Sequence, residues 1–306
     1  MVWFLTYDAT SALYDALQAV KHVAATDAAL VAPVRPIGES LDLEEVLDQI
    51  LVGDCLELLP ALPAESVDMV FIDPPYFLQL PGRRLVRWGA RSEVETPERE
   101  WDRFESFAQY DEFIGGVLEE VRRVMKPSAT IWVIGTYHNI YRIGTLMQDI
   151  GFWMLNNVTW FKSNPMPNWL NVRMTNATET LIWAVRDRGA RDYVYNAPAA
   201  KEYSREDFGA KIAANVWRIP LCIGHERLKG DNGKRLHPTQ KPERLLERVI
   251  RLSTRRGQVV LDPMAGTGTA GVVARRLGRQ FILIERDEMY AQAASRRLAE
   301  AVADEA

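Results

Sequence analysis

Cysteine and histidine are both scarce in this sequence, with two Cys and four His among 306 residues. Cys55 and Cys222 are too few for a disulfide framework. The histidines are scattered without an i, i+4 pair, so we expect no bound metal. Long uncharged apolar runs are also missing, which argues against a membrane-spanning helix. No basic and then apolar segment resembles a secretory signal, so we expect a cytoplasmic location.

A strong excess of positive charge is missing too, because the formal net charge is −4. A nucleic-acid-binding protein then needs a local basic face. Two groups of basic residues are candidates for such a face: Arg83, Arg84, Arg87 and Arg91, and separately Arg227, Lys229, Lys234 and Arg235. The alternative for either group is an ordinary solvated surface.

Short apolar runs alternate with amphipathic segments along most of the chain. Strands are expected at 50–52, 67–72, 130–134, 158–161, 181–185, 258–261 and 281–284. Helices are expected at 55–59, 110–124, 141–150, 243–253, 269–277 and 290–303. This alternation predicts an α/β fold with a largely parallel sheet and helices on both faces.

The order of these expected elements indicates one large domain. Residues 1–45 form an N-terminal extension with a possible helix over 11–25, and residues 46–306 form the domain. Within the domain we expect a long polar loop over 77–103 and an irregular, polar target-recognition segment over 186–236.

A glycine turn follows the strand expected at 258–261. Gly266 and Gly268 let the backbone approach a ligand at the carboxyl end of that strand. Glu285 ends the next strand, where a carboxylate accepts hydrogen bonds from ribose hydroxyls. The turn lacks the third glycine of the dinucleotide fingerprint and the Lys-Ser/Thr of a phosphate-binding loop. It therefore favours a nucleoside cofactor without phosphates, such as S-adenosylmethionine, over a tight turn without a ligand.

The sequence Asp73-Pro74-Pro75-Tyr76 follows the strand at 67–72. The Asp73 carboxylate and the Pro74 carbonyl are two acceptors, and the Tyr76 ring offers a stacking face. Two acceptors beside an aromatic ring suit an exocyclic amine, whose nitrogen is then aimed at an electrophilic methyl group. A base in a duplex must be flipped out to reach such a pocket. The alternative is a Pro-Pro turn with no chemistry.

The order of these two motifs is reversed relative to an ordinary methyltransferase sheet. The order is explained if the chain is a circularly permuted, seven-stranded, Rossmann-like methyltransferase. The strand at 50–52 then continues the sheet after Glu285, and Asp54 lies near the cofactor adenine.

Several motifs together resemble a known family. They are Gly53 to Cys55, Phe71 to Tyr76, Trp101 with Asp102, Phe104 to Phe107, Ile131 to Asn139, Trp160, Lys162 to Asn168, Glu179 to Ala184, Ile219 to Cys222, His237 to Pro242 and Leu261 to Thr269. With these stretches the chain resembles the β-class amino methyltransferases of DNA, and most closely the cell-cycle-regulated DNA adenine methyltransferase group.

The resemblance implies a methyl transfer from S-adenosylmethionine to adenine N6 in duplex DNA, at GANTC, by a homodimer. The implied catalytic residues are Asp73, Pro74, Pro75 and Tyr76. The implied cofactor residues are Asp54, Cys55, Thr239, Gln240, Lys241, Asp262, Met264, Gly266, Gly268, Thr269 and Glu285, with Lys241 pairing with the methionine carboxylate. The implied DNA contacts are Arg83, Arg84, Arg87, Asn164 and Trp169.

Three alternatives remain open at this point. Cytosine also has an exocyclic amine, so an N4-cytosine methyltransferase has the same pocket logic, and only family analogy at Asp73 favours adenine. RNA methylation is a second alternative, because long polar segments suit any polymeric substrate. A non-catalytic DNA-binding module is the third.

Overall fold

The computed structural model describes residues 31–32, 40–78, 85–86, 93–94, 102–168, 172–230 and 233–301. The helix expected over 11–25 lies outside these residues. Within them, no helix is both long enough and apolar enough to cross a membrane.

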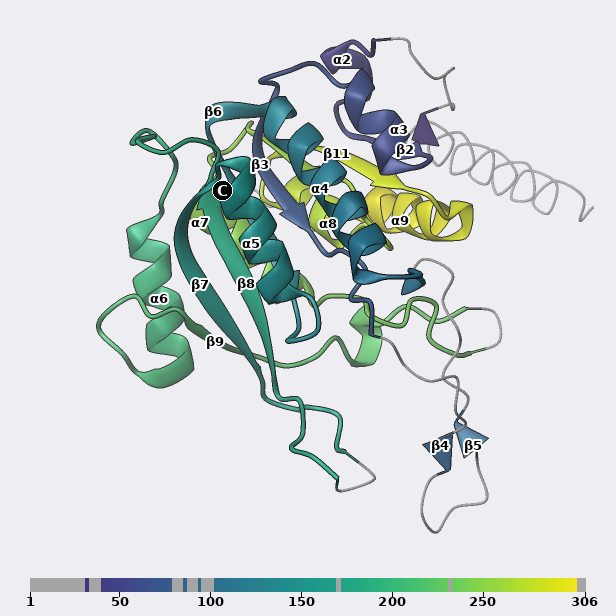
Figure 1. Ribbon diagram of the computed structural model, residues 1–306. Helices are drawn as coiled ribbons and strands as arrows, with labels where there is room; N and C mark the ends of the chain where they lie inside the picture. The colour runs from purple at the N-terminus through teal and green to yellow at the C-terminus, as the bar shows by residue number, and fades with distance from the viewer. Residues whose placement is uncertain are drawn as a thin grey trace, which may run out of the picture.

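A nine-stranded sheet forms the centre of the protein (Figure 1). In spatial order its strands are β1 (Val31–Ala32), β2 (Gln49–Val52), β11 (Gln280–Glu285), β10 (Val259–Asp262), β3 (Val67–Ile72), β6 (Met125–Gly135), β8 (Thr178–Val185), β7 (Trp153–Lys162) and β9 (Val216–Ile219). Only β8 is antiparallel to its neighbours, β6 and β7. A separate antiparallel pair consists of β4 (Leu85–Val86) and β5 (Glu93–Val94).

The strand order confirms the circular permutation. β2 pairs in parallel with β11, and β3 pairs in parallel with β10, so the two ends of the chain meet in the middle of the sheet. The seven expected strands are all present. The structure adds β1 and β9, which are short edge strands with no distinct sequence pattern. β1, which falls within the expected extension 1–45, pairs in parallel with β2.

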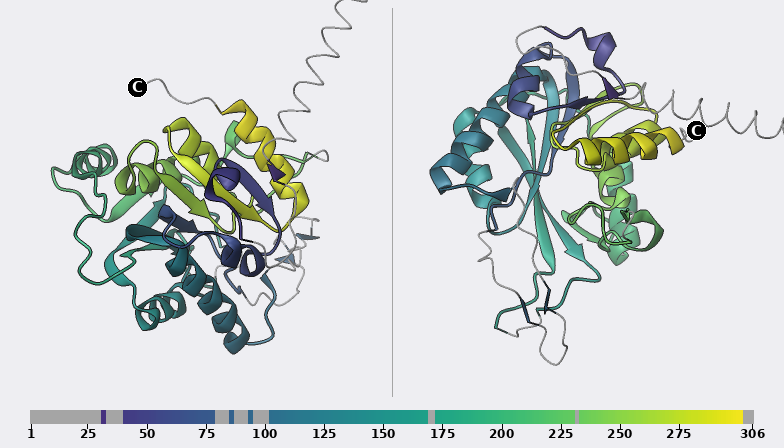
Figure 2. Two further views of the ribbon diagram at one scale, coloured as in Figure 1. Left: turned by 90° about the horizontal axis from the view of Figure 1, so that it is seen from above. Right: turned by 90° about the vertical axis from the view of Figure 1, so that its right-hand side faces the viewer.

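Helices cover both faces of the sheet (Figure 2). One face carries α4 (Phe107–Val124) and α5 (Ile140–Ile150), together with the short α2 (Leu43–Val46), α3 (Cys55–Leu58) and 3-10 helix η1 (Leu59–Ala61). The other face carries α7 (Glu243–Ser253), α8 (Thr269–Arg276) and α9 (Glu288–Glu300). Alternate residues of β10 serve the two cores: Leu261 packs on the first and Val260 on the second, as the period of a strand requires.

The segment 186–236, expected to be irregular, also contains regular elements. The segment contains α6 (Ala197–Phe208), β9 and the 3-10 helix η3 (Gly224–Glu226). The side chain of Asn196 caps α6 by accepting a hydrogen bond from the Ala199 N–H at 3.2 Å, and Gly209 ends it at φ 67°. The helix has few apolar residues, so hydrophobic periodicity does not indicate it.

A buried ion pair attaches α6 to α7. The guanidinium of Arg248, whose side chain is 0% exposed, donates to both oxygens of Asp207 at 2.5 and 2.9 Å. The cation also lies 4.6 Å from the centroid of the Tyr203 ring. The anchor of this helix is therefore a charge pair, which amphipathic patterning does not detect.

Asp207→Ala is expected to lower the free energy of unfolding by about 3–5 kcal/mol, because it leaves the buried Arg248 guanidinium with only its 3.5 Å contact to Glu206. Urea unfolding measures the change. Arg244→Ala is the control, because the Arg244–Glu206 pair is exposed and contributes less than about 1 kcal/mol. Equal losses in the two variants would contradict the assigned role of the buried pair.

Candidate active site

The turn Asp73–Tyr76 lies at the carboxyl end of β3, between β10 and β6. The Pro75 carbonyl accepts hydrogen bonds from the Tyr110 hydroxyl at 2.8 Å and from the Asn139 side-chain amide at 3.3 Å. These donors come from α4 and from the residue that precedes α5. The two helices on one face of the sheet therefore fix the turn.

The residue after the turn has an unusual backbone. Phe77 has a φ of 48°, which is rare for a bulky side chain. The Asp102 carboxylate accepts the Phe77 N–H at 2.6 Å and the Leu78 N–H at 3.2 Å. The Phe77 ring also packs against Phe104, with ring centroids 5.5 Å apart. These contacts hold the chain in this conformation at the exit of the site.

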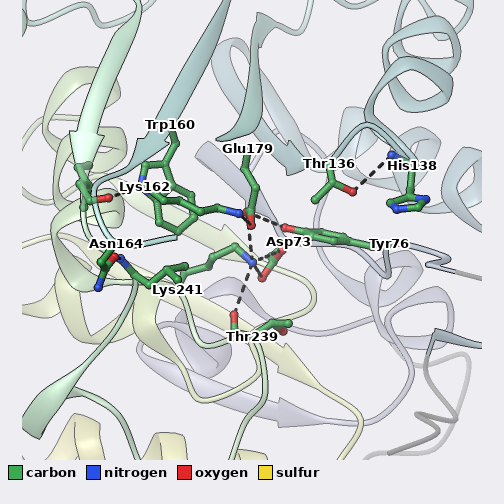
Figure 3. Close-up of polar contacts among 12 residues, drawn as sticks. Asp73, Tyr76, Thr136, His138, Trp160, Lys162, Asn164, Glu179, Thr239 and Lys241 are labelled. Carbon is green, nitrogen blue, oxygen red and sulfur yellow. Dashed lines mark hydrogen bonds and ion pairs between the residues drawn. The ribbon is translucent and has the colours of Figure 1, made fainter. Parts of the chain in front are cut away.

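Two carboxylates and two lysines meet beside Tyr76 (Figure 3). The Lys241 ammonium contacts both Asp73 oxygens, at 2.9 and 2.7 Å. Glu179 accepts from the Tyr76 hydroxyl at 3.0 Å and binds the Lys162 ammonium at 2.8 Å. The Lys241 nitrogen is 3.9 Å from Glu179, so the two pairs form one network.

Burial and charge both act on the pKa values of this network. Burial raises the pKa of Asp73, and the neighbouring Lys241 opposes that shift. Burial by itself lowers the pKa of Lys241, but the Asp73 and Glu179 carboxylates outweigh it, and the net pKa is raised. Burial also raises the pKa of Tyr76, so its hydroxyl stays protonated and remains a donor to Glu179. The network therefore contains a charged Lys241 and a neutral Tyr76 phenol.

Two carboxylates, Asp262 at the end of β10 and Glu285 at the end of β11, form a second group of acceptors. The two oxygens of Glu285 accept the Gly266 N–H at 2.7 Å and the Asp287 N–H at 2.8 Å, which fixes the carboxylate. Asp262 accepts the Met264 N–H at 3.1 Å, and burial raises the pKa of Asp262 to about 8.

Asp73, Tyr76 and Lys241 of the network line the same cavity of about 480 Å³ as Asp262 and Glu285. All four predicted catalytic residues line it, and so do all the predicted cofactor residues except Gly268. His237 and Tyr290, to which no role was assigned, line it as well. The structure therefore brings together residues separated by most of the chain.

Gly268 has a packing requirement in addition to the expected approach to a ligand. It precedes α8 at φ 72°, and a Cβ there would lie 2.6 Å from the Cβ of Ala294 on α9. Glycine is therefore needed for helix packing. Gly266 differs, because it lines the cavity and a Cβ there would meet His237 at 3.4 Å.

Three predicted cofactor residues have protein partners as well. Lys241 was expected to pair with a methionine carboxylate, and here its partner is Asp73. The Gln240 side chain accepts the Leu228 N–H at 3.0 Å and donates to the Glu226 carbonyl at 2.7 Å, so it joins this motif to the segment 186–236. Asp54 caps α3 by accepting the Leu56 N–H at 2.9 Å.

Cys55 lies at the start of α3 and lines the cavity. Its thiol is buried, and burial raises the pKa of the thiol to about 12. The side chain is therefore a neutral, apolar part of the wall.

The predicted DNA contacts are placed only in part. Asn164 is exposed, and its side-chain amide oxygen accepts the Leu221 N–H at 2.7 Å. Arg83, Arg84, Arg87, Arg91 and Trp169 lie outside the described residues. The second basic group lies in the stretch 227–235, where Lys229 and Arg235 form an antiparallel bridge. Burial, and then the nearby charge of Arg227, lower the pKa of Arg235, which indicates a local excess of positive charge.

The sequence analysis assigned no role to Glu179, Lys162, Asp102, Tyr110 or Asn139. Each occurs in a stretch that resembles the family or in a helix beside the turn, but a sequence match does not show which residues a side chain contacts. The available signal was the single charged residue in each of two strands, Lys162 at the end of β7 and Glu179 near the start of β8. Both are more than nine-tenths buried, which a solvated residue would not be.

Comparison with known families and proteins gives consistent results. A family model described as DNA methylase, of the N6 and N4 methyltransferases, matches residues 67–296. The type II methyltransferase M.HinfI of Haemophilus influenzae is 44% identical over 259 residues, which are 85% of this chain and 70% of that protein. The type II methyltransferase M2.DpnII of Streptococcus pneumoniae is 41% identical over 247 residues, covering 80% and 87% of the two chains.

A solved structure shares the fold. The crystal structure of the M1.HpyAVI–SAM complex superposes with a TM-score of 0.59 at 25% identity, covering 82% of this chain and 98% of that one. The similarity thus extends across both motifs and the sheet between them.

Gly268→Ala is expected to lower the free energy of unfolding by about 2–5 kcal/mol, from the clash with Ala294 added to the cost of a left-handed alanine. Gly266→Ala is the matched control, because it has a similar φ and no clash, and should cost about 1–2 kcal/mol. Chemical denaturation measures both values. A larger loss for Gly266→Ala would overturn the packing role of Gly268.

Proposed function

The chain belongs to the DNA methylase family, and from that premise we propose that it transfers a methyl group from S-adenosylmethionine to N6 of adenine in duplex DNA. The observation that carries the proposal is the Asp73 carboxylate beside the Tyr76 ring, in the same cavity as the Gly266 turn and Glu285.

The cavity suits a cationic nucleoside without phosphates. Asp54 and Glu285 make the cofactor end acidic, which disfavours phosphate groups and favours a ligand with positive charge. Carboxylate oxygens have lone pairs beyond those that bind backbone N–H groups, so Glu285 can also accept ribose hydroxyls. These residues fit S-adenosylmethionine, which, when bound, supplies a sulfonium methyl group to the lone pair of an amine nitrogen.

The residues of the catalytic turn position the amine. Asp73 accepts one of its N–H groups, and the Tyr76 ring stacks on the base, with its hydroxyl fixed by Glu179. Holding the nitrogen in this way aims its lone pair at the methyl group, and positioning provides most of the rate enhancement. Transfer would break the sulfur–methyl bond of the cofactor and leave its neutral thioether, and the methylated nitrogen would lose one proton to water without a covalent bond to any side chain.

The choice of adenine rests on resemblance, because cytosine presents an amine of the same kind. The Asp73–Tyr76 motif is similar to that of the cell-cycle-regulated adenine group, which also makes GANTC the first sequence to test. The same resemblance supports a homodimer. Light scattering tests the assembly, and a monomeric mass would contradict it.

The segment 186–236 is proposed to recognise the DNA around the flipped base. Its basic stretch presents exposed Lys229, Lys234 and Arg235, whose charges suit backbone phosphates. The hydrogen bonds of Gln240 to Glu226 and Leu228 hold this segment against the cavity. Contacts to phosphates would then set the register at which the base enters.

The protein should produce N6-methyladenine in duplex DNA that contains GANTC. Purified protein is incubated with duplex and methyl-labelled S-adenosylmethionine, the DNA is digested, and nucleosides are identified by mass spectrometry. Asp73→Ala should reduce the rate at least about a hundredfold, because the acceptor is lost. Asp187→Ala, on an Arg122 ion pair away from the cavity, is the control.

Labelled N4-methylcytosine in the same experiment would support methyl transfer to an exocyclic amine but contradict the choice of adenine. Label in RNA alone would overturn the choice of DNA. Full activity of Asp73→Ala would contradict the assigned catalytic turn.

Binding of S-adenosylmethionine at pH 7 should release protons from Asp262. The pKa of Asp262 is about 8 in the free protein, so the group is mostly protonated at pH 7, and a cationic ligand favours its ionised form. Calorimetry in buffers of different ionisation enthalpy measures the release. The release should fall in Asp262→Asn and persist in Asp287→Asn, whose carboxylate is exposed. Equal release in wild type and Asp262→Asn would exclude this role.

A further inference from the structure

The Lys241 ammonium lies where the proposed function requires the amine of the target base. It is an N–H donor bound to both oxygens of Asp73, at 2.9 and 2.7 Å. The same nitrogen lies 5.1 Å from the centroid of the Tyr76 ring, the ring proposed to stack on the base (Figure 3). The side chain is only 7% exposed, so it reaches Asp73 from within the protein.

We propose that Lys241 is an internal placeholder for the target amine: its ammonium occupies Asp73 in the free protein, and the entering base displaces it toward Glu179. This inference rests on the proposed function. It gives Lys241 a positioning role at the base pocket, in addition to its place beside the cofactor cavity.

Glu179 is suitably placed to receive the displaced ammonium. Its Oε2 is 3.9 Å from the Lys241 nitrogen, so a short side-chain movement converts this contact into a direct ion pair. Glu179 already binds Lys162 and the Tyr76 hydroxyl, but a carboxylate has about four lone-pair positions. The displacement keeps two lysines and two carboxylates in the network, and the amine of the base takes the place of Lys241 on Asp73.

The exchange has a consequence for base selection. An exocyclic amine replaces the donor that Asp73 loses, so the carboxylate remains hydrogen-bonded. A base without such an amine offers no donor, and Lys241 then keeps Asp73. Asp73 thereby favours amino-bearing bases, and Lys241, which competes for the same acceptor, reduces the size of that preference.

A purely structural Lys241–Asp73 ion pair would stay intact when the base binds, whereas the ion pair of a placeholder would break. Lysine side chains labelled with ¹³C and ¹⁵N report this directly by NMR, with the Lys241 signal assigned from its absence in Lys241→Arg. Wild-type protein is saturated with S-adenosylhomocysteine and with the duplex that it methylates. A second duplex carries, at the target position, the analogue that lacks only the exocyclic amine: purine for adenine, or 2-pyrimidinone for cytosine.

We expect the Lys241 signal to shift with the amino-bearing duplex and to stay unchanged with the analogue. An unshifted signal with a duplex that is methylated would overturn the placeholder while the proposed function stands. Shifts of equal size with both duplexes would also overturn it. Absence of methylation in every duplex is a separate result, and it would overturn the proposed function together with the inference.

Binding of the two duplexes to variants gives a second test. Lys241→Met removes the competitor, so the preference for the amino-bearing duplex over the analogue should rise about tenfold. The comparison is made at alkaline pH, because loss of the lysine raises the pKa of Asp73. Lys126→Met is the matched control: Lys126 contacts both oxygens of Asp68 at 2.8 Å, outside the cavity. An unchanged or reduced preference in Lys241→Met would contradict the proposal.

Discussion

Parallel pairing of β3 with β10 sets Met69 opposite Val260 and Val70 opposite Leu261. The carboxyl ends of neighbouring parallel strands lie at one edge of a sheet, where open α/β folds bind ligands. The turn after β3 and the glycine turn after β10 therefore open into the same cavity, although one lies early in the chain and the other late. The cavity depends on this pairing, because no contact within either motif brings the two together.

The buried charge network follows from the same arrangement. Asp73 comes from the end of β3, Lys162 from β7, Glu179 from β8 and Lys241 from the segment before α7. Charges removed from water are costly unless each has a partner, so these four side chains depend on one another. A protein that must bind an amine needs a strong, water-excluded acceptor, and burial of Asp73 provides one. An ammonium on Asp73 makes that burial tolerable before a base arrives.

The amino-acid sequence predicts the sheet well where residues alternate or form compact apolar runs. The strand at 67–72 and the helix at 243–253 have the bounds expected from their patterns. The prediction fails at α6, because a buried Arg248–Asp207 pair stabilises that helix where an apolar stripe is lacking. It does not reveal the packing role of Gly268, since the same residue type serves ligand approach and helix packing.

The sequence by itself determined the chemical groups available: two acceptor-rich turns after strands, an aromatic face and a carboxylate at the end of the next strand. Their order along the chain also determined the permuted sheet, because strand connections in such folds follow few topologies. Only the tertiary structure decided which side chains face each other. Lys241 contacts Asp73, and Glu179 joins Tyr76 to Lys162, across separations that no local pattern encodes. Long-range ion pairs depend on distances in space, and folding alone sets those distances.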